Sequence, residues 1–194
     1  MFQLETLAEK HVEGLHRAID LVAQERRFLG ITSAPAWDPF MREAQEAIRM
    51  NRIQLVATRN EEVLGWCSIC QIDLPTLQHA GTLFMGIIQP WRGRGIGKSL
   101  LAATLDKAWD RRLSRIDLEV YTHNAAAIRL YRRFGFIKEG FKRHAHCLDG
   151  RYHDILLMAH VRQKKELPLA ATSMSGVASP AGYTGLHSHV ASGV

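Results

Sequence analysis

The segment that most constrains the fold of this chain is "QPWRGRGIGKSLL", residues 89–101. It joins an apolar run to a run with helical spacing, and it places glycines among basic and hydroxyl side chains. Glycine has no Cβ and lets backbone N–H groups approach a ligand closely, and a helix N-terminus presents such groups to an anion. We therefore expect a strand, an anion-binding turn and a helix in succession, with charge supplied by Arg92, Arg94 and Lys98.

Two known phosphate-binding motifs do not fit this turn. A P-loop requires a glycine five positions before Gly97, where this chain has Arg92. A dinucleotide-binding fingerprint that starts at Gly93 requires its last glycine at the position of Lys98. The turn therefore predicts a phosphate site of another kind, and the alternative is a solvated glycine turn that carries basic side chains.

The pattern before the turn combines helices and strands. Helical spacing covers 11–29 and 38–50, the second with Asp38 as cap and Pro39 in its first turn. Strand-like runs follow at 53–58, 63–72 and 81–88. This order indicates two opening helices and an antiparallel pair of strands that lead into the third strand, directly before the glycines.

The pattern after the turn continues in the same way. A helix is followed by "RIDLEV" at 115–120, in which apolar and charged side chains alternate as in a half-buried strand. The next helix is expected to begin at Asn124 and to stop at Gly135. Asp149 and Gly150 then predict a tight hairpin turn between two final strands. The chain is thus expected to be an α/β domain.

Size and composition are consistent with one domain and a tail. The chain has 194 residues, of which 46% are hydrophobic, enough for one buried core. No residue is charged from Leu167 onward, and small residues dominate there. We expect a domain at 1–162 and a low-complexity, largely uncharged tail at 163–194.

Charge and cysteine content narrow the class of partner. Lys and Arg number 25 against 19 Asp and Glu, which suits an anionic ligand but does not choose among nucleotide, nucleic acid and membrane surface. The chain shows no signal-peptide pattern and no apolar run of about 20 residues, so we expect a cytoplasmic protein without a membrane role. Its three cysteines predict reduced thiols.

Two stretches resemble the motifs of the GNAT superfamily of N-acetyltransferases. Residues 92–97 fit the acetyl-CoA signature Arg/Gln-x-x-Gly-x-Gly/Ala, and "NAAAIRLYRRFGF" at 124–136 is similar to Asn-x-x-Ala-x-x-x-Tyr-x-x-x-Gly-Phe. The resemblance implies the fold of that family over 1–162: a mixed, splayed central β-sheet of about six to seven strands flanked by about four helices. "ERRFL" from Glu25, Trp37 and "DGRYHDILLMA" look most like the bacterial branch that acetylates L-amino acids or phosphinothricin-like amino acids.

The same resemblance implies a binding site for acetyl-CoA as co-substrate, and no metal. Its pyrophosphate would lie on the glycine turn, and its pantetheine arm and thioester would lie against the strand before the turn. The residues expected to hold it are Met85, Ile87, Arg92, Gly93, Arg94, Gly95, Ile96, Gly97, Lys98, Ser99, Asn124, Ala127, Tyr131 and Arg133.

Acetyl transfer to an amine needs a neutral nucleophile, donors for an oxyanion, and a proton for the departing thiolate. Gly86 within an apolar strand predicts a β-bulge that leaves amides around Met85 to Ile87 unpaired, and the alternative is close packing. The resemblance places Tyr131 at the sulfur as general acid, and the alternative is a core aromatic. Asn124 is a helix cap by its position and a cofactor or substrate contact by resemblance.

A general base is the residue least defined by the sequence. Many family members use an acid on the strand before the turn, but "HAGTLFMGII" at 79–88 has none. His79 and Glu119 are the candidates, each with the alternative of an ordinary surface or sheet residue. No strong base is needed if the acceptor is an α-amine of pKa ~8, because part of it is neutral at physiological pH.

The remaining candidates concern the acceptor. Cys67 and Cys70 have metal-like spacing, but residues three apart on a strand point to opposite faces, so we expect structural cysteines. A two-residue turn at 149–150 would pair His146 with His153 and leave His144 on the same face. That face could recognise an acceptor carboxylate, could bind metal, or could be an exposed polar surface. The residues expected to bind the acceptor are Glu25, Arg26, Trp37, His144, His146 and His153.

The sequence therefore predicts an acetyl-CoA-dependent N-acetyltransferase that acts on the α-amine of a small amino acid or analogue, with Tyr131 as general acid. Two alternatives stay open: acetylation of a protein N-terminus or ribosomal protein, and a non-catalytic module that binds CoA or nucleic acid, the latter disfavoured. The oligomeric state is open as well, with a homodimer as one alternative.

Overall fold

A computed structural model describes residues 1–162, so the tail expected at 163–194 lies outside the described residues. The described part forms one seven-stranded sheet in the order β1-β2-β3-β4-β5-β7-β6. Its elements are β1 (Gln3–Thr6), η1 (Glu9–His11), α1 (Val12–Gln24), α2 (Trp37–Arg49), β2 (Ile53–Arg59), β3 (Glu62–Cys70), β4 (Ala80–Ile87), η2 (Gln89–Trp91), α3 (Ile96–Asp110), β5 (Arg115–Tyr121), α4 (Ala125–Arg133), β6 (Ile137–Leu148) and β7 (Arg151–Val161).

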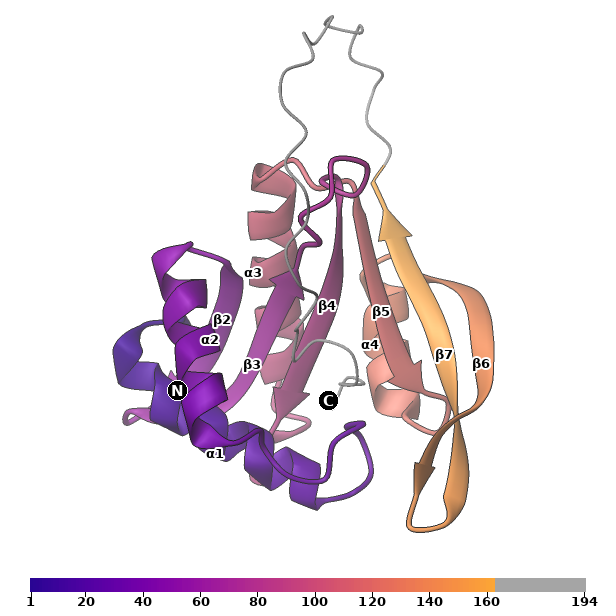
Figure 1. The fold of residues 1–194 in the computed structure, drawn as a ribbon, viewed down its shortest axis with the longest axis horizontal. Helices are drawn as coiled ribbons and strands as arrows, with labels where there is room; N and C mark the ends of the chain where they lie inside the picture. The colour runs from indigo at the N-terminus through magenta and orange to yellow at the C-terminus, as the bar shows by residue number, and fades with distance from the viewer. Residues whose placement is uncertain (163–194) are drawn as a thin grey trace, which may run out of the picture.

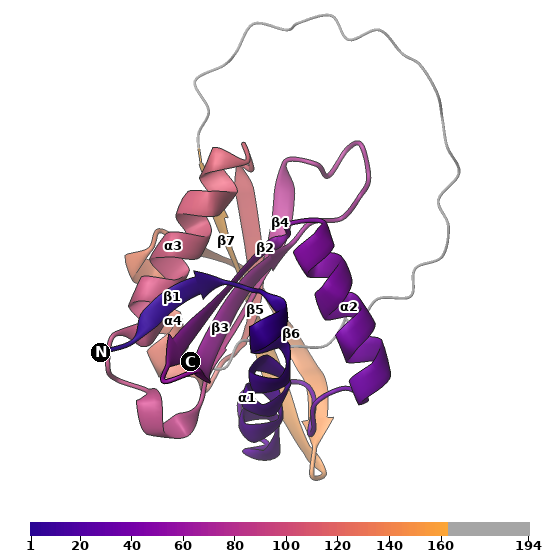
Figure 2. The ribbon, with the colours of Figure 1, turned by 90° about the vertical axis from the view of Figure 1, so that its left-hand side faces the viewer.

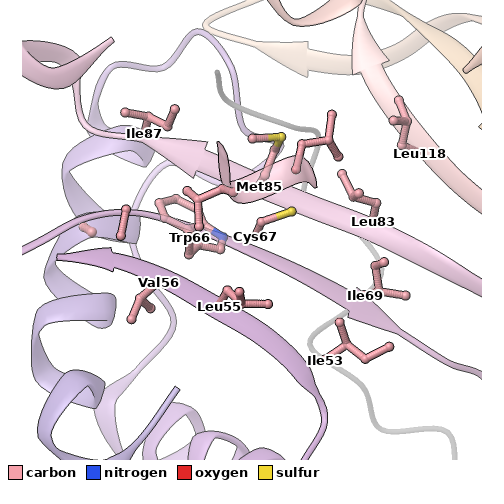
Figure 3. Packing of buried hydrophobic residues seen from close by; sticks show 14 of the residues in the cluster. Ile53, Leu55, Val56, Trp66, Cys67, Ile69, Leu83, Met85, Ile87 and Leu118 are labelled. Carbon is pink, nitrogen blue, oxygen red and sulfur yellow. The ribbon is translucent and has the colours of Figure 1, made fainter. Parts of the chain in front are cut away.

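The helices cover the two faces of this sheet. Helices α1 and α2 lie on one face, and α3 and α4 lie on the other (Figures 1 and 2). Side chains alternate between the two faces along each strand, and Figure 3 shows how apolar side chains of β2, β3 and β4 pack around Cys67 and Met85, both fully buried. The core therefore holds β4 in place from both sides.

The sheet opens between its two central strands. Strands β4 and β5 are parallel and pair only from Ala80 to Thr82, whereas β4 stays paired with β3 as far as Ile87. Beyond Thr82 the two strands diverge toward their carboxyl ends (Figure 1). The expectation of a mixed, splayed sheet flanked by helices is confirmed.

Several local predictions are confirmed. Gly135 follows α4 with a φ of +86°, the left-handed conformation expected of a glycine that stops a helix. Asp149 and Gly150 form the turn of the last hairpin, with Leu148 opposite Arg151. All three cysteines are free thiols. Cys67 is fully buried, and burial raises the pKa of its thiol to about 12.

Other local predictions are wrong. The bulge expected at Gly86 is absent, because Gly86 stays in register opposite Trp66. A Cβ at Gly86 would stand 2.3 Å from the Trp66 ring, so close packing explains this glycine. Helix α1 ends at Gln24, so "ERRFL" at 25–29 is not part of the helix, contrary to the prediction from the sequence. Helix α2 begins at Trp37, so Asp38 lies inside its first turn and is not the cap. Strand β1 was not expected.

None of the helices in the described residues is both long and apolar enough to cross a membrane.

Candidate functional site

The glycine turn (residues 89–97) leads from the open end of β4 into α3. Gly93 and Gly95 have φ angles of +73° and +85°, which L side chains rarely adopt. A Cβ built on either glycine meets no atom within 4 Å, so both border open space. Because Gly95 is the N-cap of α3 and carries no capping side chain, the first N–H groups of the helix are left for a ligand.

This open space is part of a cavity of about 560 Å³, which we call the basic cavity. It lies between the glycine turn, the start of α4 and the loop that follows α1. Four of its described lining residues are Arg or Lys, and none carries a carboxylate. The full lining is Arg27, Phe28, Ile87, Arg92, Gly93, Gly95, Gly97, Lys98, His123, Asn124, Ala125, Ala126, Leu130 and Arg133. Glycine amides at a helix start and this charge fit an anionic, phosphate-bearing ligand.

The predicted cofactor residues divide into two groups by position. Eight of them line the basic cavity: Ile87, Arg92, Gly93, Gly95, Gly97, Lys98, Asn124 and Arg133. The other six, Met85, Arg94, Ile96, Ser99, Ala127 and Tyr131, are not among its lining residues. Met85, Ile96, Ala127 and Tyr131 belong to the buried core, and the Arg94 guanidinium lies 4.9 Å from the Trp91 ring centroid.

Arg92 has a structural partner that the sequence did not reveal. Its Nη1 and Nη2 donate to the Glu25 carboxylate at 2.7 and 2.6 Å, and its Nε donates to the Ile87 carbonyl at 2.8 Å. The guanidinium also lies over the Phe28 ring, 4.9 Å from its centroid. Arg92 therefore joins the loop after α1 to the end of β4, and Glu25, predicted to bind the acceptor, is held in this ion pair.

The edge of β4 that faces the splay carries the backbone groups predicted around Met85 to Ile87. The Ile88 N–H bonds to the Leu64 carbonyl of β3, so the backbone groups of Ile87 point the opposite way, toward β5. The same alternation turns the Met85 N–H toward β5. Since β4 and β5 do not pair there, this edge presents donors to the splay without any bulge.

Asn124 and Tyr131 frame the start and the end of α4. Asn124 is buried, and its Oδ1 accepts from the Ala127 N–H at 3.2 Å, which confirms its role as a helix cap. Tyr131 is fully buried, and its ring lies 5.7 Å from that of Phe136. Its packing fits a core aromatic, and its role as general acid stays a prediction.

The two candidate bases lie apart from the glycine turn. His79 precedes β4, at the opposite end of that strand, where its carbonyl accepts from the N–H groups of Ser114 and Arg115. Glu119 lies on β5, where its carboxylate is paired with the Lys142 ammonium. The placement of His79 does not fit the base predicted from the sequence, and Glu119 is engaged in an ion pair.

The histidines of the last hairpin are only partly as expected. His146 pairs with His153 as predicted. His144 does not share their face, because β6 is irregular between Lys142 and His146, and its ring stacks on Tyr152 at 4.9 Å. This prediction was therefore wrong for His144.

Two further aromatic residues, Tyr121 and His123, join His146 and His153. The Tyr121 hydroxyl lies 2.7 Å from His146 Nδ1, and the Tyr121 ring stacks on His123 at 5.2 Å. His123 also lines the basic cavity. Extending the alternation of 115–120 by one residue places Tyr121 on the same face of β5 as Glu119, which is the sequence signal for the position of the Tyr121 side chain.

No set of side chains in residues 1–162 has the arrangement of a metal site.

The loop after α1 contacts both sides of the splay. Arg26 forms an ion pair with Asp149 at the hairpin turn, and the Arg27 carbonyl lies 2.9 Å from His123 Nε2. Together with the pair of Glu25 and Arg92, these contacts hold the loop across the open end of the sheet. Trp37 lies farther along, 40% exposed, with its ring 5.2 Å from that of His16.

Comparisons with known proteins match this architecture. The model of the acetyltransferase (GNAT) family matches residues 15–136. The L-amino acid N-acetyltransferase AaaT of Escherichia coli (strain K12) is 28% identical over 142 residues, 72% of this chain and 87% of that protein. The ribosomal protein bS18-alanine N-acetyltransferase of the same strain is 36% identical over 80 residues, 40% of this chain and 53% of that protein.

Solved structures show the same fold. The acetyltransferase yncA from Salmonella typhimurium, solved with its cofactor acetyl-CoA, superposes with a TM-score of 0.79 at 16% identity, over 88% of this chain and 99% of that chain. A ribosomal-protein-alanine N-acetyltransferase from Brucella melitensis gives a TM-score of 0.76 at 22% identity, over 82% and 99% of the two chains.

Proposed function

The chain belongs to the acetyltransferase (GNAT) family and is an acetyl-CoA-dependent N-acetyltransferase, and we propose that its acceptor is the α-amine of a small amino acid or a close analogue. The observation that carries this proposal is the placement of the two candidate bases, because His79 lies at the far end of β4 from the glycine turn and Glu119 is paired with Lys142. An acceptor with a weakly basic amine needs the least help from the protein to lose its proton. The likeness to an L-amino acid N-acetyltransferase supports the same acceptor.

The glycine turn is the part of the chain that would hold the phosphates. Gly93 and Gly95 leave room for them, the first N–H groups of α3 point to them, and Lys98 adds positive charge. The Arg92 charge is largely balanced by Glu25, so its main effect there is to fix the shape of the turn. The bound cofactor supplies the activated acetyl thioester.

The backbone of β4 and the phenol of Tyr131 would serve the transfer itself. The N–H groups of Met85 and Ile87, aimed into the splay, are placed to stabilise negative charge on a carbonyl oxygen. Tyr131 donates a proton to the departing sulfur, and its burial in the core keeps the ring in one orientation. The acceptor approaches from the α1 and α2 side, beneath the loop that follows α1.

A protein N-terminus is the second candidate acceptor. It also presents an α-amine, and the chain is similar to a ribosomal protein bS18-alanine N-acetyltransferase over part of its length. The loop after α1, tied to the hairpin by the pair of Arg26 and Asp149, restricts the space above the splay. That restriction favours the free amino acid.

The acceptor is tested by a panel assay with the purified protein and acetyl-CoA, in which CoA thiol release is measured. The panel holds free amino acids, short peptides with free N-termini, and polyamines. Amino acids are expected to give the highest kcat/KM. A higher kcat/KM with peptides would support the second candidate, and activity only with polyamines would overturn both.

A further inference from the structure

A second cavity, unused in the chemistry above, lies between α1, α2 and the sheet. It encloses about 120 Å³, and we call it the apolar pocket. Its walls include the apolar side chains of Leu15, Ile19, Ile31, Phe40, Trp66 and Phe84. Polar side chains also line it: Glu43, Arg52, Gln54, Ser68 and Cys70. Arg52 is exposed, so it lies where the pocket meets solvent.

The apolar pocket adjoins the segment of β4 that borders the splay. Phe84 lines the apolar pocket, and Ile87 lines the basic cavity. The two residues are three positions apart on one strand, about 10 Å at the usual rise per residue, so their side chains lie on opposite faces of the sheet and the two cavities are separated by the backbone of β4. The Trp66 ring, another wall of the pocket, covers Gly86 between the two backbone donors of Met85 and Ile87.

We propose that the apolar pocket receives the side chain of the acceptor, so that the enzyme prefers α-amino acids with a compact apolar side chain. This inference rests on the proposed function, because it assumes an α-amine acceptor. A dry apolar cavity of about 150 Å³ can hold benzene, so the smaller apolar pocket, of about 120 Å³, has room for a branched aliphatic side chain. A charged side chain would lose its hydration against Leu15, Ile19 and Phe40.

The first test uses the unmodified protein and requires no variant. We expect kcat/KM for leucine to exceed the values for alanine and for asparagine, which resembles leucine in shape, by at least about 10-fold each, because hydrophobic pockets discriminate on that scale. Equal kcat/KM values for leucine, alanine and asparagine would overturn the inference, as would a preference for acidic or basic side chains.

The second test fills the pocket. Ala44 on α2 lines it and is 5% exposed, so Ala44→Leu places new methyl groups inside. Gln45→Leu is the matched control, because Gln45 is the next residue of α2 and is exposed. We expect Ala44→Leu to lower kcat/KM for leucine at least about 10-fold and to leave the value for alanine within about twofold, with no change in Gln45→Leu.

Two results separate this inference from the proposed function. If Ala44→Leu lowers kcat/KM for alanine and leucine equally, the pocket does not hold the side chain, although the α-amine acceptor stands. If no α-amine is acetylated while another amine is, the proposed function fails, and the inference fails with it. Should Ala44→Leu not fold, the smaller change Ala47→Val, on the same helix and the same pocket, is measured in its place.

Discussion

Glu25 and Arg92, which are 67 positions apart in the chain, form a two-point ion pair with N–O distances of 2.6 and 2.7 Å. Their side chains are only 22% and 19% exposed. The pair fixes the loop after α1 against the turn after β4, so the entrance to the splay depends on a contact between the first residue of one family motif, Arg92, and Glu25, which lies outside both motifs.

Breaking this pair should destabilise the protein. Glu25→Gln removes the charge that balances a half-buried guanidinium, and we expect the free energy of unfolding to fall by about 1 to 3 kcal/mol, measured by denaturant titration. The control is Glu46→Gln, whose ion pair with Arg49 is exposed at 41% and 69%, and a change below about 0.5 kcal/mol is expected there. Equal effects in both variants would contradict the role of the Glu25 pair.

The glycine turn should be required for acetyl-CoA binding. Gly95→Val adds side-chain atoms to the space proposed for the phosphates, at a φ of +85°. We expect acetyl-CoA to raise the Tm of the unmodified protein and to leave that of Gly95→Val unchanged. Gly150→Val is the control, because Gly150 has a φ of +73° and open space, but lies in the hairpin turn. It should lose stability through backbone strain and keep the acetyl-CoA-induced rise in Tm.

Loss of the cofactor-induced rise in both glycine variants would mean that strain, rather than the occupied space, abolishes binding. A normal rise in Gly95→Val would show that the turn does not hold the phosphates.

Tyr131→Phe should separate packing from catalysis. The ring and its contact with Phe136 are kept, so the Tm should change little, whereas loss of the proton donor should lower kcat by about 100-fold. Tyr152→Phe is the control, since Tyr152 is 64% exposed on β7. The Tm and the kcat of this variant should equal those of the unmodified protein. A large fall in Tm with an unchanged kcat would assign Tyr131 to the core alone.

The two sites were predictable from the sequence to different degrees. Glycine spacing and the Asn124 cap are local signals, and local signals defined the turn, α4 and the hairpin at Asp149. The position of the apolar pocket depends on which side chains of α2 face β3 and β4, and no local pattern gives that pairing.

The errors have specific physical causes. His144 lies in an irregular stretch of β6 between Lys142, opposite Ile155, and His146, opposite His153, and its φ of +50° departs from the extended conformation on which the expected alternation of faces depends. The sequence of β4 alone predicts a bulge at Gly86, because the Trp66 ring that packs on this glycine comes from a neighbouring strand. The ion pairs of Glu25 and Arg26 join residues 67 and 123 positions apart, beyond the reach of periodicity.

Cysteine reactivity should follow burial. Because burial raises the pKa of Cys67 to about 12, its thiol stays protonated until the pH approaches that value. With iodoacetamide at about pH 8 we expect alkylation of the exposed Cys147 and none of Cys67, measured by peptide mass spectrometry on the folded protein. Denatured protein should be alkylated at both positions. Rapid modification of Cys67 in the folded state would show that the core opens at this point.

The pH dependence of kcat/KM should be set by the pKa of the acceptor amine. If no strong base serves the splay, kcat/KM rises with pH as the free amine loses its proton, and it levels off at the pKa of that amine. Two acceptors with amine pKa values about one unit apart, each determined by direct titration, should then give inflections that differ by the same amount.

His79→Ala and Glu119→Gln should leave both inflections in place, because His79 lies at the far end of β4 and Glu119 is paired with Lys142. His123 is the histidine that lines the basic cavity, so His123→Ala tests the competing explanation. An inflection near ~6.5 that is the same for both acceptors and disappears in His123→Ala would identify a histidine base and contradict the assignment of the inflection to the acceptor.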